Sequence, residues 1–151
     1  MEKRIINAFT LLEVVLILAI LAIVLSIAIP KFSQYLKDYN ISNQIDKLYS
    51  DINYAKFYSI SHHVPVNINI SQNQIEALTN DTNSTLILKN NFNYPVSCSN
   101  NSAIIALNAF GIAQGVINCY VSQENDANPN CFVIEYSKIS TGRWINGLCQ
   151  Q

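Results

Sequence analysis

Hydrophobic residues follow three successive patterns along this chain. From Phe9 to Ile29 the side chains form an almost continuous apolar run of 21 residues (9 to 29 inclusive), in which Glu13 is the one ionisable group. As an α-helix such a run would be about 31 Å long, which is close to the thickness of the hydrocarbon core of a bilayer. Because Lys3 and Arg4 precede the run, we expect its N-terminal flank to stay in the cytoplasm and the rest of the chain to lie outside.

Two familiar kinds of apolar N-terminal segment explain this run less well. A secretory signal peptide has a shorter apolar centre of about 7–15 residues and small residues at the cleavage site, and the stretch from Ser26 to Pro30 makes a poor site of that kind. An ordinary membrane anchor explains the length and the orientation but not Glu13. A carboxylate costs on the order of 2–3 kcal/mol near the bilayer centre and less towards the edge. Glu13 is therefore a candidate functional residue.

Beyond Pro30 the apolar residues recur at steps of three and four, which predicts an amphipathic helix. This stripe consists of Phe32, Leu36, Tyr39, Ile45, Leu48, Ile52, Ala55 and Ser59. Pro30 itself lacks a backbone donor, so we expect it to kink the helix or to open one turn. The two patterns together predict one long helix from about Phe9 to Ser59, half in lipid and half packed on a domain.

After Pro65 the period changes to two, which is typical of half-buried strands. The alternation predicts an α+β fold, in which the long N-terminal helix packs on a mostly antiparallel β-sheet domain. Strands are predicted at 64–70, 75–79, 85–89, 103–107 and 116–121, with an irregular stretch at 90–102. A final hairpin is predicted from strands at 131–136 and 143–148, with its turn around Ser140, Thr141 and Gly142.

All four cysteines lie on the expected exported side, which favours disulfide bonds in an oxidising compartment. Three connectivities are open. The predicted hairpin favours Cys131 with Cys149, because both are equidistant from residue 140 and would face each other across two strands. Cys98 and Cys119 would then form the second bond.

Composition argues against several classes of function. The net charge is −1 and charged residues make up 13% of the chain, so composition offers no basic face for nucleic acid. The cysteines lack metal-ligand spacing and have no nearby histidine, so we expect no metal site. There is neither a catalytic constellation nor a Gly-rich phosphate loop, and we expect neither enzyme activity nor a cofactor.

The segment Ala8-Phe9-Thr10-Leu11-Leu12-Glu13 resembles the processing site of type IV pilins and of the pseudopilins of type II secretion. The basic leader, the small residue before Phe9, the apolar run and Pro30 belong to the same resemblance. It implies a pilin-like fold and removal of the leader Met1 to Ala8 by a prepilin peptidase, which also methylates the new N-terminus at Phe9.

In that family the segment from Thr10 to Glu13 serves processing and assembly. The resemblance implies that Glu13 meets the positively charged N-terminus of a neighbouring Phe9, and an opposite charge stabilises a carboxylate in a low-dielectric helix bundle. One departure is that the family usually has Gly before the cut, where this chain has Ala8. Alanine is also small, so we expect slower processing at worst.

A second resemblance covers the β domain. The stretch from Leu107 to Gly111, followed by Gly115 and later by Thr141-Gly142-Arg143, is similar to the GspH/FimT branch of minor pilins and minor pseudopilins. Some FimT-like members bind DNA through a C-terminal Gly-Arg-x-Arg, whereas this chain lacks the second arginine. Arg143 and Trp144 would offer a phosphate contact and a stacking surface. The alternative, which we favour, is a surface arginine beside a tryptophan that covers the sheet edge.

These resemblances imply a leader at 1–8, a transmembrane and filament-core helix at 9–30, an amphipathic half at 31–63 and a periplasmic β domain at 64–151. The expected protein is a subunit of a type IV pilus or a type II secretion pseudopilus, held in the bacterial inner membrane before assembly. Its expected partners are the prepilin peptidase, other pilins or pseudopilins, the inner-membrane assembly platform and lipid. Two alternatives are a DNA-capturing minor pilin and an anchored periplasmic domain without a filament.

Overall fold

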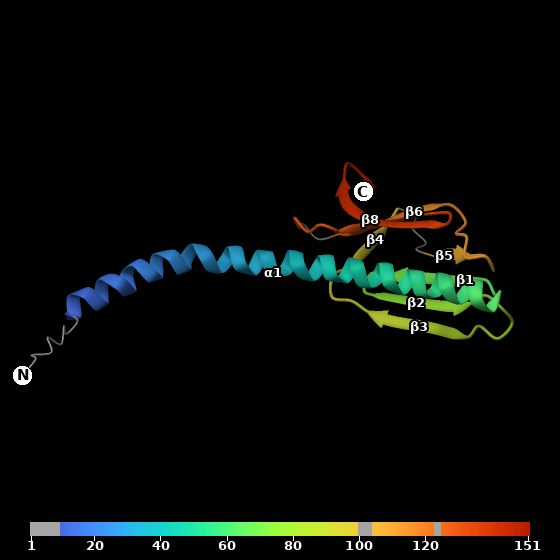
Figure 1. Cartoon of the computed structure of the whole chain (residues 1–151), viewed down its shortest axis with the longest axis horizontal. Helices are drawn as coiled ribbons and strands as arrows, with labels where there is room; N and C mark the ends of the chain where they lie inside the picture. The colour runs from blue at the N-terminus through green and yellow to red at the C-terminus, as the bar shows by residue number, and fades with distance from the viewer. Residues whose placement is uncertain (1–9, 100–103, 123–124) are drawn as a thin grey trace, which may run out of the picture. The chain divides into compact units, whose positions relative to one another are not determined.

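A computed structural model describes residues 10–99, 104–122 and 125–151 of the chain. Its fold class is α+β, as the change from helical period to period two predicts (Figure 1). The elements within the described residues are α1 (Leu11–His62), β1 (Val66–Ser71), β2 (Gln74–Thr79), β3 (Leu86–Asn91), β4 (Val96–Cys98), β5 (Ile104–Leu107), β6 (Val116–Val121), β7 (Cys131–Glu135), β8 (Lys138–Ile145) and β9 (Leu148–Gln150).

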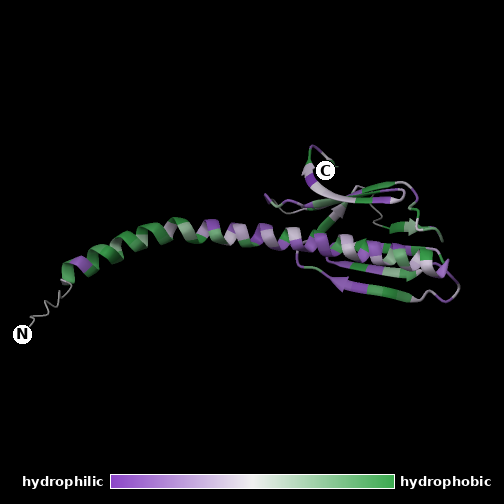
Figure 2. Cartoon of the chain, in the orientation of Figure 1, coloured by the Kyte–Doolittle hydropathy of each residue, from purple (hydrophilic) through white to green (hydrophobic). Residues whose placement is uncertain are grey.

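The chain divides into two compact units between Leu36 and Lys37. In the N-terminal unit, α1 continues through Pro30. Figure 2 shows that the first part of α1 is almost uniformly hydrophobic, in contrast to the mixed colouring of its later turns. The helix assignment agrees with the predicted continuous helix, while the kink at Pro30 stays a prediction.

The C-terminal unit holds two antiparallel sheets. The first has the strand order β3-β2-β1-β5, and the second has the order β4-β6-β7-β8-β9. Each predicted strand up to residue 121 is present with small shifts of its bounds, and residue 103 of the predicted strand at 103–107 lies outside the described residues. Figure 1 shows the C-terminal half of α1 running alongside both sheets.

A single core joins the later turns of α1 to both sheets. The buried helix residues are Ile41, Gln44, Ile45, Leu48, Ile52, Ala55 and Ser59, which recur at steps of three and four. They share one cluster with buried residues of both sheets, such as Ile68 on β1 and Phe132 on β7. Burial of this apolar surface stabilises the unit at roughly 25 cal/mol per Å².

The predicted apolar stripe extended too far towards the N-terminus. Phe32 and Tyr39 are 62% and 54% exposed, and Leu36 is also exposed. The buried face begins at Ile41, which the stripe omitted, because it is there that the sheets start to cover the helix. The predicted helix is therefore present along the whole stripe, but the stripe is buried on the domain only from Ile45 onwards.

The C-terminus of α1 lies three residues beyond the predicted end at Ser59. His63 follows α1 with φ of 55°, and the Val64 N–H donates to the Ser59 carbonyl at 3.2 Å. This bond and the left-handed residue form a Schellman motif, which satisfies carbonyls that the last helical turn leaves free. The motif reverses the chain direction and places β1 on the core.

The predicted irregular stretch at 90–102 contains a strand, β4, which the sequence did not reveal. β4 has only three residues and comes directly after Pro95. It pairs with β6 so that Cys98 lies opposite Cys119, and these two cysteines form a disulfide. Pairing with β6 therefore determines that this segment is a strand, whereas its own hydrophobic pattern does not.

The final hairpin differs from the prediction. β7 and β8 turn at Tyr136 and Ser137, and the predicted turn residues 140–142 lie inside β8, where Cys131 pairs with Gly142. A second hairpin follows, in which β8 and β9 are joined by Asn146 and Gly147. Both of these residues have positive φ, 52° and 84°, as a two-residue type I′ turn requires.

The disulfide between Cys131 and Cys149 is nevertheless present, so the pairing was right although the geometry behind it was wrong. β7 and β9 are not neighbours, because β8 lies between them in the sheet order. Their cysteine Cα atoms are 5.8 Å apart, whereas strands two positions apart in a flat sheet would be separated by about 9.6 Å. The sheet must therefore bend within β8.

Gly142 is the residue that permits this bend. A Cβ atom at this position would lie 1.9 Å from the Gln150 carbonyl oxygen, which is far inside van der Waals contact. On its N-terminal side β8 pairs with β7, and from Arg143 onwards it pairs with β9. The glycine is needed here for the close approach of two backbones, and a turn was the wrong interpretation.

Candidate functional site

The start of α1 is built by a local hydrogen-bonding motif. The Thr10 hydroxyl oxygen accepts a hydrogen bond from the Glu13 N–H at 3.3 Å, and the Thr10 carbonyl oxygen accepts from the same N–H at 3.0 Å. Thr-x-x-Glu ahead of an apolar run matches the sequence of a capping box, and of its two reciprocal bonds the one accepted by the threonine hydroxyl is present among the described residues, while the one accepted by the glutamate is not. The sequence motif at 10–13 therefore defines the beginning of the helix.

Two of the predicted site residues, Ala8 and Phe9, lie outside the described residues. The leader-cleavage and N-methylation predictions for them stay predictions. Leu11 and Leu12 begin the helix and are 83% and 76% exposed.

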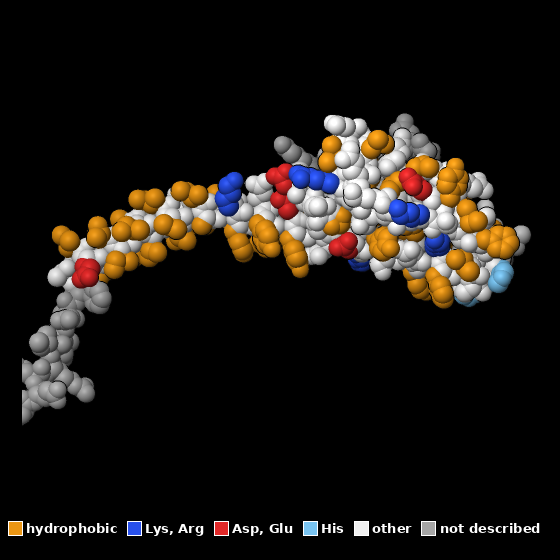
Figure 3. Space-filling view, turned by 45° about the horizontal axis from the view of Figure 1, so that its top comes forward, with side chains coloured by type: hydrophobic (Ala, Val, Ile, Leu, Met, Phe, Trp, Pro, Cys, Tyr) orange, Lys and Arg blue, Asp and Glu red, His pale blue; other side chains and the backbone are white. Residues whose placement is uncertain are grey.

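The carboxylate of Glu13 has no ion pair or hydrogen bond within the described part of the chain. Glu13 belongs to a segment, residues 10–36, in which each residue is exposed. Hydrophobic side chains cover the first part of α1 on the face seen in Figure 3. Any partner for this acid must therefore come from outside the described residues.

Within the described residues, α1 is the one helix that is long and apolar enough to cross a membrane. No part of its most apolar stretch is buried against the rest of the described protein. An exposed apolar surface of this extent is unusual for a soluble monomer and marks contact with lipid or with other apolar surfaces. The helix is consistent with a single-pass membrane anchor.

The stretch Leu107 to Gly111, which carries part of the second resemblance, is a tight turn docked on α1. The Asn108 side-chain oxygen accepts from the N–H groups of Phe110 at 2.9 Å and Ile112 at 3.0 Å. The Ser59 hydroxyl donates to the Asn108 carbonyl at 2.7 Å. Gly111 has φ of 70°, which favours glycine at this point of the turn.

Arg143 and Trp144, the predicted DNA-contact residues, both have partners within the protein. The Arg143 guanidinium lies 3.4 Å from the Asp126 carboxylate. The Trp144 ring stacks on Tyr120 with ring centroids 4.0 Å apart and an angle of 12° between the planes. One face of the indole is therefore covered, and the nearest carboxylate offsets the arginine charge.

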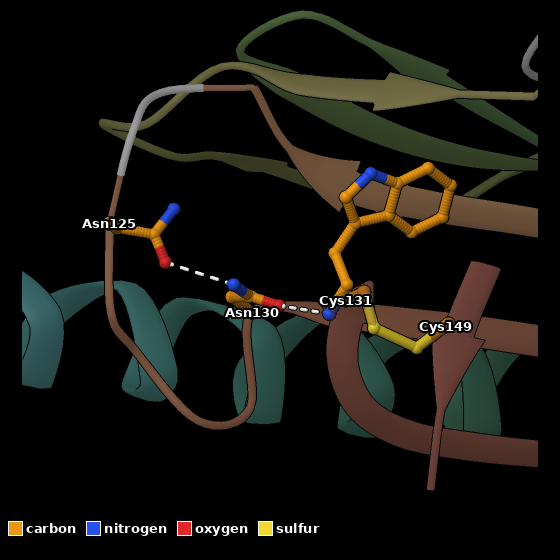
Figure 4. The surroundings of a disulfide bond; sticks show 5 residues. Asn125, Asn130, Cys131 and Cys149 are labelled. Atoms are coloured by element: carbon orange, nitrogen blue, oxygen red, sulfur yellow. Dashed lines mark hydrogen bonds between the residues drawn. A yellow bond between two sulfur atoms is a disulfide. The ribbon is translucent and has the colours of Figure 1, made fainter. Parts of the chain in front are cut away.

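Asn130 holds the backbone at this point, a role that no local pattern in the sequence indicates. Its side-chain oxygen accepts from the Trp144 N–H at 2.7 Å, and its side-chain N–H donates to the Asn125 oxygen at 3.1 Å. Figure 4 shows this chain of hydrogen bonds beside the Cys131–Cys149 disulfide. Asn130 thus accepts the Trp144 N–H at the point where β8 no longer pairs with β7.

The alternative, in which Trp144 covers the sheet edge and Arg143 is a surface residue, stays a prediction. Contact with DNA at these two residues also stays a prediction. A gel-shift measurement comparing the protein with an Arg143→Ala variant would test it, and unchanged binding would argue against the site.

Comparisons with known proteins add no relative. A scan against family models, a search of curated proteins and a search of solved structures each returned no match. Within the described residues, no group of three or more His, Cys, Asp or Glu side chains is arranged to hold a metal ion.

Proposed function

We propose that this protein is a minor pilin or minor pseudopilin, a structural subunit that is stored in a membrane and assembled into a filament through its N-terminal helix. The observation that carries the proposal is Glu13, which has no ion pair among the described residues and lies near the start of an exposed apolar helix. A plain anchor accounts for the helix but not for an acid whose carboxylate takes no part in the cap at Thr10.

In the proposed cycle the apolar helix first holds the subunit in the bacterial inner membrane, with the β domain in the periplasm. The two disulfides support an oxidising compartment for that domain. The prepilin peptidase then cuts between Ala8 and Phe9 and methylates the new terminus. An assembly platform extracts the subunit, and helices of neighbouring subunits cover the apolar surface.

Glu13 would set the axial register of this packing. Inside a low-dielectric bundle, an ionised carboxylate is strongly destabilised unless an opposite charge lies close to it. The terminal amine of Phe9 on the adjacent subunit would provide that charge. Hydrophobic contact would then supply most of the association free energy, and the ion pair would select one stagger among many.

A Glu13→Val variant tests this role. Membrane insertion, measured by resistance to alkaline extraction, should stay intact because valine makes the helix more apolar. Incorporation into sheared filaments, or co-purification with the other pilins, should fall. A Ser26→Val variant is the matched control, since it removes a polar group from the same helix without touching the acid. Equal incorporation of the Glu13→Val variant and the wild-type protein would refute the proposal for this residue.

Mass spectrometry of the N-terminus separates a filament subunit from an anchored domain. The proposal expects a chain that begins at methylated Phe9. A chain that keeps Met1, or one that is cut near Pro30, would support a tethered periplasmic domain. Both measurements use protein recovered from the membrane fraction.

A further inference from the structure

A groove lined by polar and aromatic side chains lies between α1 and the connection from β3 to β4, within the C-terminal unit. Its volume is about 310 Å³. Asn40, Asn43 and Lys47 line it from the helix, where a spacing of three and four residues puts them on one face. Phe92, Asn93 and Tyr94 line it from the connection. Figure 1 shows this connection passing beside α1.

Gln44 fixes the two walls of the groove to each other. Its amide N–H donates to the Tyr94 carbonyl at 2.7 Å, and its amide oxygen accepts from the Tyr94 N–H at 3.0 Å. Gln44 is 9% exposed, so both bonds are largely shielded from water. This side chain takes the place of a neighbouring strand and joins α1 to the connection at Tyr94.

The connection is also tied to the hairpin between β1 and β2. The Phe92 N–H donates to the Asn73 carbonyl at 2.9 Å, and the Asn73 side-chain N–H donates to the Phe92 carbonyl at 3.1 Å. The Val96 N–H donates to the Gln72 carbonyl at 2.9 Å. The groove is therefore formed before any ligand arrives, which lowers the entropy that binding would lose.

The polar groups that line the groove are available to a ligand. Asn40, Asn43 and Asn93 are exposed, and their amides have no hydrogen-bond partner among the described residues. Each amide offers two donors and one acceptor. Lys47 is the one charged side chain in the lining, and it too has no ion pair in the part of the chain that the structure describes. Phe92 and Tyr94 are half-buried and add aromatic surface.

We propose that this groove binds a short segment of an acidic oligosaccharide. Vicinal hydroxyl groups both donate and accept, as the three amides do, and the apolar faces of sugar rings pack on aromatic side chains. Lys47 would meet a carboxylate on one sugar. This inference concerns the surface of the β domain and does not depend on assembly through the N-terminal helix.

Other ligand classes fit the groove less well. An apolar molecule would leave the amides unpaired, and each buried unpaired group is unfavourable. A nucleic acid strand requires several cations along its path, whereas Lys47 stands alone in this lining. β3 is an edge strand and its last residue, Asn91, also lines the groove, but an extended peptide added to this edge would pair with the β3 backbone and not with the side chains of Asn40, Asn43 and Lys47 on α1.

The test uses the full chain in a zwitterionic detergent without sugar head groups. Binding of hexagalacturonate is followed by isothermal titration, with maltohexaose as a neutral probe and short polyaspartate as an anion without hydroxyl groups. The variants are Asn43→Ala, Asn93→Ala and Lys47→Ala. Asn69→Ala, an exposed asparagine on β1, is the matched control, and near-ultraviolet circular dichroism checks the fold of each variant.

We expect hexagalacturonate to bind and each groove variant to weaken it about tenfold, while Asn69→Ala leaves it unchanged. Maltohexaose should bind more weakly than hexagalacturonate, and polyaspartate should not bind. Lack of hexagalacturonate binding at millimolar concentration would overturn the proposal, as would binding that the groove variants do not change. Equal binding of polyaspartate would show that charge alone explains the binding, and this result would also overturn the proposal.

Discussion

Cys131 and Cys149 are joined by a disulfide although their strands are separated by a third strand in the sheet order. Such a bond requires β9 to fold back towards β7, and the bend that allows this lies at Gly142. The disulfide therefore holds a bend in the sheet, and Arg143 and Trp144 follow directly after that bend.

Removing this disulfide should destabilise the C-terminal unit. The bond closes a loop with a sequence separation of 18 residues, and a loop of this size contributes about 3 kcal/mol in the chain-entropy account. A Cys131→Ser, Cys149→Ser double variant should therefore melt on the order of 10 °C lower than the wild-type protein. Thermal unfolding followed by circular dichroism measures the shift. An unchanged melting temperature would show that other contacts hold the bend.

Gly142→Ala should also destabilise the protein, for a steric reason. The new methyl group would meet the Gln150 carbonyl oxygen, so β8 and β9 must separate, and overpacking of this kind typically costs about 1–3 kcal/mol. Gly147→Asn is the matched control, because no atom lies within 4 Å of a Cβ there and asparagine tolerates positive φ. Urea unfolding should rank Gly142→Ala well below Gly147→Asn. The reverse order would contradict the close approach seen at Gly142.

The features that the sequence predicted are those that local patterns encode. Alternation in β1 and β2 and the helical period from Ile45 onwards each depend on residues that are close in sequence. Asn146-Gly147 is a strong local signal for a hairpin that the prediction missed, because both residues were placed inside a strand. The turn was predicted instead at Ser140-Thr141-Gly142, whose residues are typical of turns but lie inside β8.

The features that the sequence did not predict depend on residues far apart in the chain. Asp126 pairs with Arg143, and Tyr120 stacks on Trp144. These sequence separations do not correspond to any helical or strand period. β4 is defined by its partner β6, and the groove beside α1 exists because Gln44 reaches Tyr94, 50 residues away. In the candidate site, therefore, the sequence alone marks Glu13 as a candidate functional residue. It does not predict the partners of Arg143 and Trp144.

Gln44→Leu should destabilise the C-terminal unit and open the groove. The substitution leaves the Tyr94 N–H and carbonyl without their shielded partner, and each unpaired group costs about 1–3 kcal/mol. The free energy of unfolding from urea titration should therefore fall by at least about 1 kcal/mol. Asn43→Ala, one residue earlier and exposed, should change it by less than about 0.5 kcal/mol. Equal stability of the two variants would show that the amide clamp contributes nothing.

Asp81 should make the β2–β3 connection sensitive to acid. Its carboxylate accepts from the Thr79 hydroxyl at 2.8 Å and from the Ser84 N–H at 2.9 Å, and the Thr79 bond is the largest cause of a pKa for Asp81 below its ordinary value. A lowered folded-state pKa stabilises the fold fully above the ordinary aspartate pKa of about 3.9 and loses this effect as the pH falls through the folded value.

Wild-type protein should therefore be more stable than Asp81→Ala at neutral pH, and the difference should shrink as the pH falls below about 4. The measurement is the urea midpoint of both proteins across the acid range. Asp46→Ala, at an exposed position on α1, controls for the loss of one negative charge and should show no comparable convergence with the wild-type protein. If the gap between wild-type protein and Asp81→Ala were constant from about pH 7 to about pH 2, the charged form of Asp81 would not be what the hydrogen bonds stabilise.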